Sequence, residues 1–349
     1  MGISLRAPSW LQRKFHFFSH DLGIDLGTAN TLIYAKHKGI ILNEPSLVAI
    51  DVESGKPLAV GKTAKEMFGK TSGGVRCARP MKDGVIADFE TTSCMMNYML
   101  GQVRSYGSFF KPRTIIGVPS GITQVEKRAV IDAALNAGAR EVRLVEEPMA
   151  AALGAGLPVD QAVGNMIVDI GGGTTEVAII SMCGTVYSHS IRVAGDEMDE
   201  AIQRYLKRQF GLQVGIFEAE RLKLLLGSAL PLGKERYART YGRDVTSGLP
   251  QQADVSDEII RDALNEPISA IIASVVTALE QTNAEIAQDI ISRGIFLAGG
   301  GALLKGLSER LQRETGITFR RTQDPLSCVA RGVGCIVDNL SELRSLCIA

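Results

Sequence analysis

A run of three glycines between two apolar segments constrains the fold of this chain more than any other feature. Residues 166–170 and 176–180 are rich in β-branched residues, which favours two strands joined by a turn over a helix. The glycines at 171–173 leave backbone N–H groups bare, so an anion can approach without meeting a Cβ atom. Asp169 stands just before the turn, where a carboxylate would hold a metal ion or orient water. The segment fits either an anion-binding hairpin or a glycine-rich hairpin without a ligand.

The same plan occurs a second time near the start of the chain. Residues 22–35 read as a strand, Asp25, a glycine-containing turn and a second strand. The recurrence of this plan around Asp25 and Asp169 predicts two related halves, each offering a hairpin turn to the same ligand. Two such turns would clamp a phosphate chain from both sides, with the two carboxylates ordering Mg²⁺ and its water molecules.

Length and composition fit a soluble protein and exclude several classes. At 349 residues the chain is too long for one typical core, which predicts about two domains. The balance of 38 basic and 38 acidic residues gives no support for nucleic-acid binding. Six scattered cysteines without a Cys-x-x-Cys pair argue against a zinc site and a disulfide framework, and suit a reducing cytoplasm. No charge-free apolar run reaches about 18 residues, so no transmembrane helix is expected. The P-loop and the G-x-G-x-x-G fingerprint are both missing.

The first 20 residues differ from the rest of the chain. Their basic residues occur with no acidic residue before Asp21. At about 100° per residue, the large apolar side chains share one arc of a helix: Trp10, Leu11, Phe15, Phe17 and Phe18. This pattern favours a short helix lying on an anionic membrane over an arm that packs its aromatic residues on the body of the protein. Phe109 and Phe110, in a turn-rich stretch, fit either a small satellite core or a second membrane contact.

Residues 142–155 run from a strand through two glutamates and a proline into a helix of small residues. Pro148 suits the first turn of this helix, and Glu146 and Glu147 suit its positive end. Capping explains one acid, and we expect the other to face the phosphate site and polarise a water molecule. The alternative is that both acids only cap the helix.

Further segments have local signals. Thr123 and Glu126 are spaced for a capping box, and residues 268–279 keep the period of a core-facing helix. The glycines at 299–301 follow a strand, and their bare backbone would admit a flat ring such as adenine. Residues 228–256 are polar and turn-rich, and the pattern assigns no element there.

The ordered motifs resemble the superfamily of actin, sugar kinases and DnaK-type chaperones. They occupy residues 25–28, 147–151, 169–174 and 299–302 and the small-residue helix that starts at Asp324. Within that superfamily, residues 21–338 are similar to the MreB family of bacterial actins. The long sequence motifs that carry this similarity are residues 25–31, 79–88, 146–152 and 168–177 and the run from Gly195.

The resemblance implies an α/β actin-like ATPase fold that closes on ATP and Mg²⁺. Two domains would each contain a duplicated, ribonuclease-H-like core sheet flanked by helices, with small outer subdomains. The implied limits are residues 1–20 for the membrane arm, residues 21–155 with 325–349 for the first domain and residues 156–324 for the second. The outer subdomains would occupy about residues 40–75 and about residues 195–256.

The resemblance also implies roles for single residues. Asp25 and Asp169 would serve the metal, largely through water, and Glu147 would polarise the attacking water with help from Thr174. Glu146 would be the helix cap. The phosphates would contact Thr28, Ala29, Asn30, Gly172, Gly173 and Thr174. The nucleoside would contact Glu220, Arg221, Leu222 and Lys223, and the adenine Gly300, Gly301, Ala302 and Leu303. Phe109 and Phe110 would belong to a membrane-touching loop.

The implied function is a filament protein of the bacterial cytoplasm, bound to the inner face of the cell membrane. It would maintain rod shape by organising cell-wall elongation, with slow ATP hydrolysis tied to polymerisation. Its partners would be further copies in paired protofilaments, the membrane, and cell-wall elongation proteins of the RodZ, MreC and MreD type. The alternatives are a small-molecule kinase, which needs an aspartate base and a substrate pocket between domains, and a plasmid-segregating actin, which should lack the membrane arm.

Overall fold

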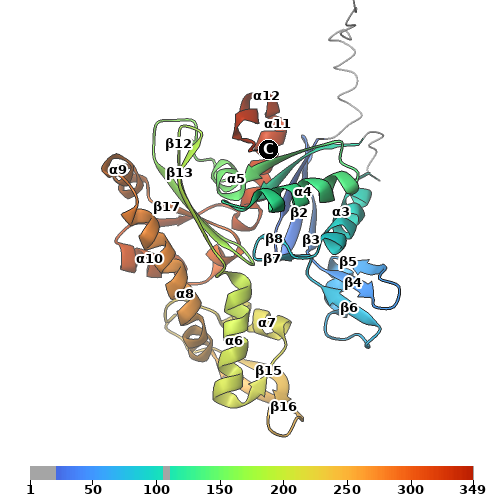
Figure 1. Cartoon of the computed structure of the whole chain (residues 1–349). Coiled ribbons are helices and arrows are strands. Elements are labelled where there is room, and N and C mark those ends of the chain that lie inside the picture. Colours follow the sequence, from blue (N-terminus) through green and yellow to red (C-terminus); the bar gives the residue numbers. More distant parts are fainter. Residues whose placement is uncertain (1–20, 105–110, 349) are drawn as a thin grey trace, which may run out of the picture.

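Two five-stranded sheets form the centre of the molecule (Figure 1). The structure, a computed structural model, describes residues 21–104 and 111–348, so the predicted arm and Phe109 and Phe110 lie outside the described residues. The first sheet has the order β3-β2-β1-β9-β10 and the second β13-β12-β11-β17-β18. The strands of the first are β1 (Leu22–Leu26), β2 (Asn30–Ala35), β3 (Gly39–Pro45), β9 (Arg113–Val118) and β10 (Glu141–Glu146). Those of the second are β11 (Asn165–Ile170), β12 (Thr175–Ser181), β13 (Gly184–Ile191), β17 (Ile295–Ala298) and β18 (Phe319–Arg321).

The two sheets share one topology. In each, a central strand pairs antiparallel with the strand that follows it, which pairs antiparallel with the next. On its other side the central strand pairs parallel with a strand that arrives later in the chain, and a fifth strand adds parallel to that one. The repeat predicted from the hairpins at Asp25 and Asp169 therefore extends over both sheets. It places the two turns at equivalent positions.

Two helices lie side by side where the sheets meet (Figure 1). Helix α11 (Cys328–Asp338) packs on the first sheet, and α5 (Glu147–Gly154) packs on the second. A Cβ atom on Gly154 would overlap the carbonyl oxygen of Cys328, and one on Gly332 would overlap that of Ala150. The helices are thus in backbone contact, which only glycine permits. One apolar cluster, which includes Ile115 of the first sheet and Ile167 of the second, surrounds the pair.

Each large sheet carries a smaller three-stranded sheet farther out. The first consists of β4 (Val48–Asp51), β5 (Pro57–Val60) and β6 (Val75–Ala78), with α2 (Lys62–Met67) beside it. The second consists of β14 (Leu212–Gln213), β15 (Tyr237–Asp244) and β16 (Pro250–Ser256), near α6 (Gly195–Phe210) and α7 (Ile216–Leu226). A hairpin thus fills most of the stretch to which the sequence assigned no element. Most side chains of this hairpin are not buried, so the apolar alternation of a half-buried strand is missing.

The remaining helices and strands flank the sheets. Helix α4 begins with the predicted capping box between Thr123 and Glu126. Helix α8 buries Ile268, Ile271 and Val275, as the period predicted. It is also the one helix among the described residues that is long and apolar enough to cross a membrane, a weak sign because half of that window is buried in the protein. The other bounds are β7 (Met81–Lys82), β8 (Val85–Ile86), α3 (Phe89–Arg104), α4 (Gln124–Asn136), α8 (Asp257–Glu280), α9 (Ala284–Arg293), η1 (Gly300–Leu303), α10 (Leu307–Thr315), η2 (Pro325–Ser327), α12 (Leu340–Leu343) and η3 (Arg344–Leu346).

The helix contact predicts the effect of a single methyl group. Gly332→Ala should lower the free energy of unfolding by about 1–3 kcal/mol, because the helices must separate to admit it. Urea unfolding followed by circular dichroism measures this effect. The control is Gly101→Ala in α3, where nothing lies within 4 Å of the added Cβ and stability should stay equal or rise. Equal midpoints for the two variants would contradict the close contact.

Candidate functional site

The turns that follow β1 and β11 touch one another. A Cβ atom on Gly172 would lie 2.9 Å from the Cβ of Ala29, and one on Gly173 would lie 2.7 Å from Oγ1 of Thr28. Glycine is therefore required at both positions for the turns to meet. The backbone N–H of Gly84 donates to Oγ1 of Thr28 at 3.2 Å, which holds the first turn against the β7–β8 hairpin. The two halves of the molecule therefore meet here mainly through backbone atoms, with few side chains between them.

A cavity of about 460 Å³ opens beside the two turns. This volume is in the usual range for small-molecule sites. Most of the site residues predicted from the sequence line it: Asp25, Thr28, Ala29, Asn30, Glu147, Asp169, Gly172, Gly173, Thr174, Glu220, Lys223, Gly300, Gly301 and Leu303. The structure therefore gathers segments that are far apart in the sequence around one space.

Three of the predicted contact residues do not line the cavity. Arg221 pairs with Glu218 and donates to the backbone carbonyl of Arg239. Leu222 is fully buried in the core beneath the second sheet, and Ala302 is buried in the same core. Residues 220–223 lie on the α-helix α7, where successive residues point about 100° apart, so four in a row do not face one site. The cavity is thus lined by Glu220 and Lys223 of the first run and by Gly300, Gly301 and Leu303 of the second.

Carboxyl groups without ion-pair partners lie at this site. Burial raises the pKa of Asp25 to about 7, and burial with the nearby charge of Asp25 raises the pKa of Asp169 to about 8. Glu147, the first residue of α5, has a pKa well above its ordinary value because of burial and the charges of Glu176, Asp25 and Asp169. Asp25, Asp169 and Glu147 form no ion pair within the described part of the chain. Over that part, no three His, Cys, Asp or Glu side chains are grouped to hold a metal ion directly.

Sequence reasoning missed Glu176, a carboxyl group that joins the two sheets. It lies on β12 opposite Asp169 and is 1% exposed. Its carboxylate accepts hydrogen bonds from the hydroxyl of Ser190 at 2.5 Å and from the backbone N–H of Ser120 at 3.3 Å, just beyond β9. Burial raises the pKa of Glu176 to about 7, although these hydrogen bonds oppose the shift. In the sequence, Glu176 lies within a predicted strand. Nothing in that strand indicates a contact with the other sheet.

Comparison with known proteins identifies the family. Residues 19–345 match the family model described as MreB/Mbl protein. The chain belongs to the MreB/Mbl family. It is 53% identical to the cell shape-determining protein MreB of Escherichia coli (strain K12) over 329 residues, which cover 92% of this chain and 94% of that protein. The crystal structure of MreB5 of Spiroplasma citri bound to ADP matches with a TM-score of 0.89 at 36% identity, covering 94% of this chain and 98% of that one. The AMPPNP-bound crystal structure of the same protein matches with the same values. The actin-like fold and the family predicted from the sequence are confirmed.

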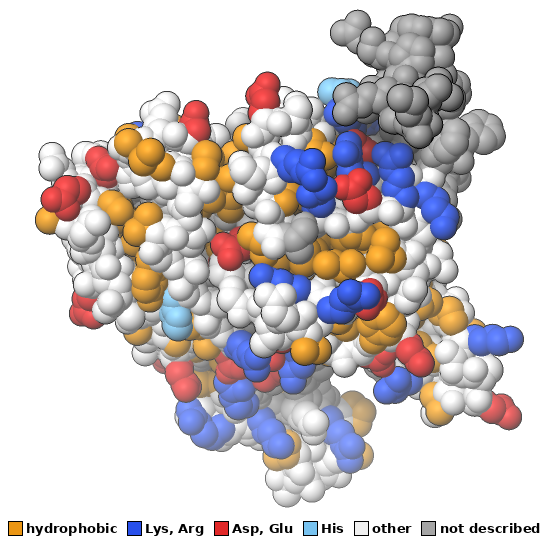
Figure 2. Space-filling model, turned by 45° about the horizontal axis from the view of Figure 1, so that its top comes forward, with side chains coloured by type: hydrophobic (Ala, Val, Ile, Leu, Met, Phe, Trp, Pro, Cys, Tyr) orange, Lys and Arg blue, Asp and Glu red, His pale blue; other side chains and the backbone are white. Residues whose placement is uncertain are grey.

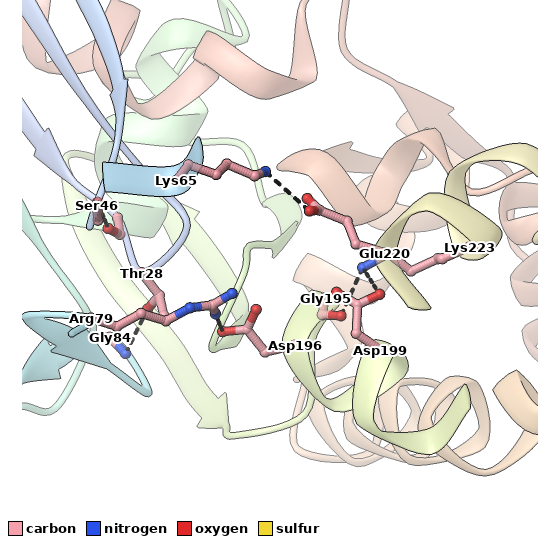
Figure 3. A network of polar contacts seen from close by, with 11 residues as sticks. Thr28, Ser46, Lys65, Arg79, Gly84, Gly195, Asp196, Asp199, Glu220 and Lys223 are labelled. Atoms are coloured by element: carbon pink, nitrogen blue, oxygen red, sulfur yellow. Dashed lines mark hydrogen bonds and ion pairs between the residues drawn. The ribbon is translucent and has the colours of Figure 1, made fainter. Parts of the chain in front are cut away.

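Ion pairs cross the cleft of this MreB/Mbl family member (Figure 3). Lys65 of α2 lies 3.0 Å from Glu220 of α7, so the two outer regions are joined across the cavity mouth. Arg79 lies 2.7 Å from Asp196 at the start of α6. Both pairs are partly accessible to solvent, and such pairs contribute on the order of 0–1 kcal/mol. The cleft is therefore closed by weak, reversible contacts.

Further features of the MreB/Mbl site become visible only in the fold. Lys223 pairs with Asp199 at 2.8 Å and donates to the carbonyl of Gly195 at 2.8 Å, which ties α7 to α6 (Figure 3). Three leucines that are exposed to solvent line the same cavity: Leu224, Leu303 and Leu326. An exposed leucine is ordinary in any sequence, so Leu224 and Leu326 could be found only from the fold.

The raised pKa of Glu176 predicts a pH dependence of stability in the nucleotide-free protein. Between its ordinary pKa of 4.5 and the folded value of about 7, the folded state binds more protons at this group than the unfolded state. The contribution of Glu176 is therefore present below about pH 4.5 and is lost as pH rises through 7. As pH rises from 5 to 8, the free energy of unfolding of Glu176→Gln should therefore increase relative to that of the wild type by on the order of 2 kcal/mol. Urea unfolding of both proteins across this range measures the difference, and parallel curves would contradict it.

Proposed function

We propose that this chain is an ATP-dependent, actin-like filament protein that maintains rod cell shape by organising cell-wall elongation. The observation that carries the proposal is the cavity between two halves of one topology, lined by both glycine turns and by Glu147. The relative named cell shape-determining protein MreB, at 53% identity, supports the cellular role. The crystal structures of MreB5 with ADP and with AMPPNP support a nucleotide as the ligand.

The nucleotide would lie with its phosphates against the two turns. Residues 28–30 would donate from one side and residues 172–174 from the other, through backbone N–H groups and the threonine hydroxyls. The adenine would lie against Gly300 and Gly301, where the nearby leucines offer apolar surface. The cavity has room for such a ligand.

A magnesium ion fits the carboxyl groups at the phosphate end. Asp169 is buried and Asp25 is half-buried. Both are unpaired and have raised pKa values, so each would be stabilised as an anion by a nearby cation. Because no direct ligand cluster exists among the described residues, the two carboxylates would hold the ion largely through its water molecules. The bound ion would offset the charge that develops on the phosphates.

Hydrolysis would depend on positioning and electrostatics, with water as the nucleophile. Glu147 is held at the start of α5 with a raised pKa, which suits a group that polarises water and accepts a proton. Thr174, also in the lining, would help to place that water. The reaction would be slow and tied to assembly.

Assembly would use further copies of this chain, stacked head to tail in paired protofilaments. The Lys65–Glu220 pair joins the two outer regions across the cavity mouth, so a bound nucleotide would bias their separation. The proposed moving parts are the predicted domains, residues 21–155 with 325–349 and residues 156–324, with their outer subdomains. Cell-wall elongation proteins of the RodZ, MreC and MreD type would bind the filament.

Glu147→Gln tests the proposed chemistry. Phosphate release should fall about 100-fold or more, while ATP should still trigger filaments visible by electron microscopy, because the change removes a proton acceptor and no phosphate contact. The matched control is Glu146→Gln, since Glu146 is outside the cavity lining and accepts from the hydroxyl of Thr185 at 3.1 Å.

Two outcomes would contradict this account. One is loss of hydrolysis in both variants alike. The other is a wild-type protein that stays monomeric and turns over ATP rapidly only when a metabolite is added, which is the behaviour of a small-molecule kinase.

We further propose attachment to the inner face of the cytoplasmic membrane. The contacts would be the apolar residues of the arm and the pair Phe109 and Phe110, all outside the described residues. Deleting residues 1–20 and changing Phe109 and Phe110 to serine should abolish sedimentation with anionic liposomes, because the inserted apolar surface is removed. If the protein still sediments, the membrane contact is elsewhere.

A further inference from the structure

One edge of the first sheet, formed by the ends of its strands and not by an outermost strand, brings together residues from five parts of the chain. The register pairs Leu22 with Thr114, and Arg113 with Glu141, so β1, β9 and β10 all begin at this edge. Strand β2 ends there, and the N–H of Lys36 donates to the carbonyl of Asp21 at 3.0 Å. The C-terminal segment reaches the same sheet, where the N–H of residue 348 donates to the carbonyl of residue 144 at 2.9 Å. Residues 1–20 join the body at this point.

Five basic side chains belong to this edge, which we name the basic edge: Lys36, Arg113, Arg140, Arg143 and Arg344. A groove of about 690 Å³ runs along it, lined by all of these except Arg140 and by Glu141, Asp338, Leu340 and Ser341. Figure 2 shows Lys and Arg side chains gathered on this face, with few acidic side chains among them. The chain as a whole has a formal net charge of zero, so this is a local concentration of positive charge.

The acidic residues at the basic edge are already engaged. Asp21 is 4% exposed and pairs with Arg113 at 2.5 Å and with Arg140 at 3.9 Å. Glu141 pairs with Arg143 at 2.8 Å. The third acid, Asp338, accepts a hydrogen bond from the Tyr34 hydroxyl at 2.7 Å.

Two of the cations have no such partner. Lys36 and Arg344 form no ion pair within residues 21–104 and 111–348. The buried Nε of Arg113 also has no hydrogen-bond partner there. Unpaired cations along a groove are suited to an incoming anion that carries several oxygens.

The chain's own first segment cannot supply that anion. Residues 1–20 contain Arg6, Arg13 and Lys14 and no aspartate or glutamate. The segment and the basic edge are therefore charged with the same sign. A partner common to both would carry the opposite sign and be extended, not a single small ion. An anionic membrane surface has these properties, and it attracts clustered Lys and Arg residues.

We propose that the basic edge binds the phosphate headgroups of anionic membrane lipids, with Lys36 and Arg344 flanking the headgroup in the groove. This proposal rests on the proposed membrane attachment and refines it. The apolar residues insert into the bilayer, and the basic edge binds its anionic headgroups. The cations lie on or beside folded elements, so they need no folding step to meet the headgroups. Binding through them should weaken with rising salt.

The test compares two double variants of the full-length chain by vesicle flotation. Lys36→Gln with Arg344→Gln removes the two unpaired cations of the groove. Lys207→Gln with Arg313→Gln removes one exposed lysine from α6 and one exposed arginine from α10, neither of which forms an ion pair with a described residue. Vesicles are phosphatidylcholine alone or phosphatidylcholine mixed with phosphatidylglycerol. ATP binding and circular dichroism confirm that each variant folds, and Arg344→Glu alone provides a second, single-site variant.

The groove variant should bind the mixed vesicles about 30-fold more weakly than the wild type. Each lost cation should weaken the binding free energy by roughly 1 kcal/mol, and about 1.4 kcal/mol corresponds to a tenfold change in affinity. The control variant should bind as the wild type does, and binding to pure phosphatidylcholine should not change. Inorganic phosphate at constant ionic strength should not displace the protein.

Equal binding of groove and control variants to the mixed vesicles would overturn the proposal. So would a wild-type protein that shows no preference for the anionic vesicles, or displacement by inorganic phosphate, which would indicate a small-anion site. A wild type that binds neither vesicle would overturn membrane attachment as well, while ATP-triggered filaments in the same preparation would leave the filament function standing.

Discussion

The backbone contact between α5 and α11 is the constraint on which the rest of the structure depends. Gly154 and Gly332 let the helices approach until any side chain would overlap a carbonyl oxygen, and each helix packs on a different sheet. The separation of the sheets is thereby fixed, and with it the meeting of the two glycine turns. The same contact places Glu147, the first residue of α5, beside both turns. The positions of the site residues therefore depend on how closely α5 and α11 pack.

The electrostatics of the cavity explain why a ligand and closure belong together. The carboxyl groups of Asp25, Asp169 and Glu147 are unpaired. Burial raises the pKa of all three, and neighbouring carboxylates raise those of Asp169 and Glu147 further. A bound cation would supply the missing positive charge. The ion pairs that cross the mouth are individually weak, so the ligand rather than the pairs would decide how firmly the halves are held. A nucleotide-dependent filament needs this kind of balance.

Sequence reasoning reached the parts of the fold that are specified locally. Both hairpins, the capping box at Thr123, the core helix and the family follow from residues that are adjacent or in regular spacing. What it missed depends on long-range packing. Glu176 matters through Ser120, just beyond β9 of the other sheet. Leu222 lies in the core although Glu220 and Lys223 of the same helix line the cavity. The hairpin β15–β16 has too few buried side chains to leave an apolar pattern.

The central claim is that one nucleotide is held by both halves at once. A crystal structure of this chain with Mg²⁺ and a non-hydrolysable ATP analogue tests it most directly. The account predicts density for the phosphates between residues 28–30 and residues 172–174, with the adenine against Gly300 and Gly301 and the ion near Asp25 and Asp169. A nucleotide that contacts only one turn, or that binds outside this cavity, would contradict it.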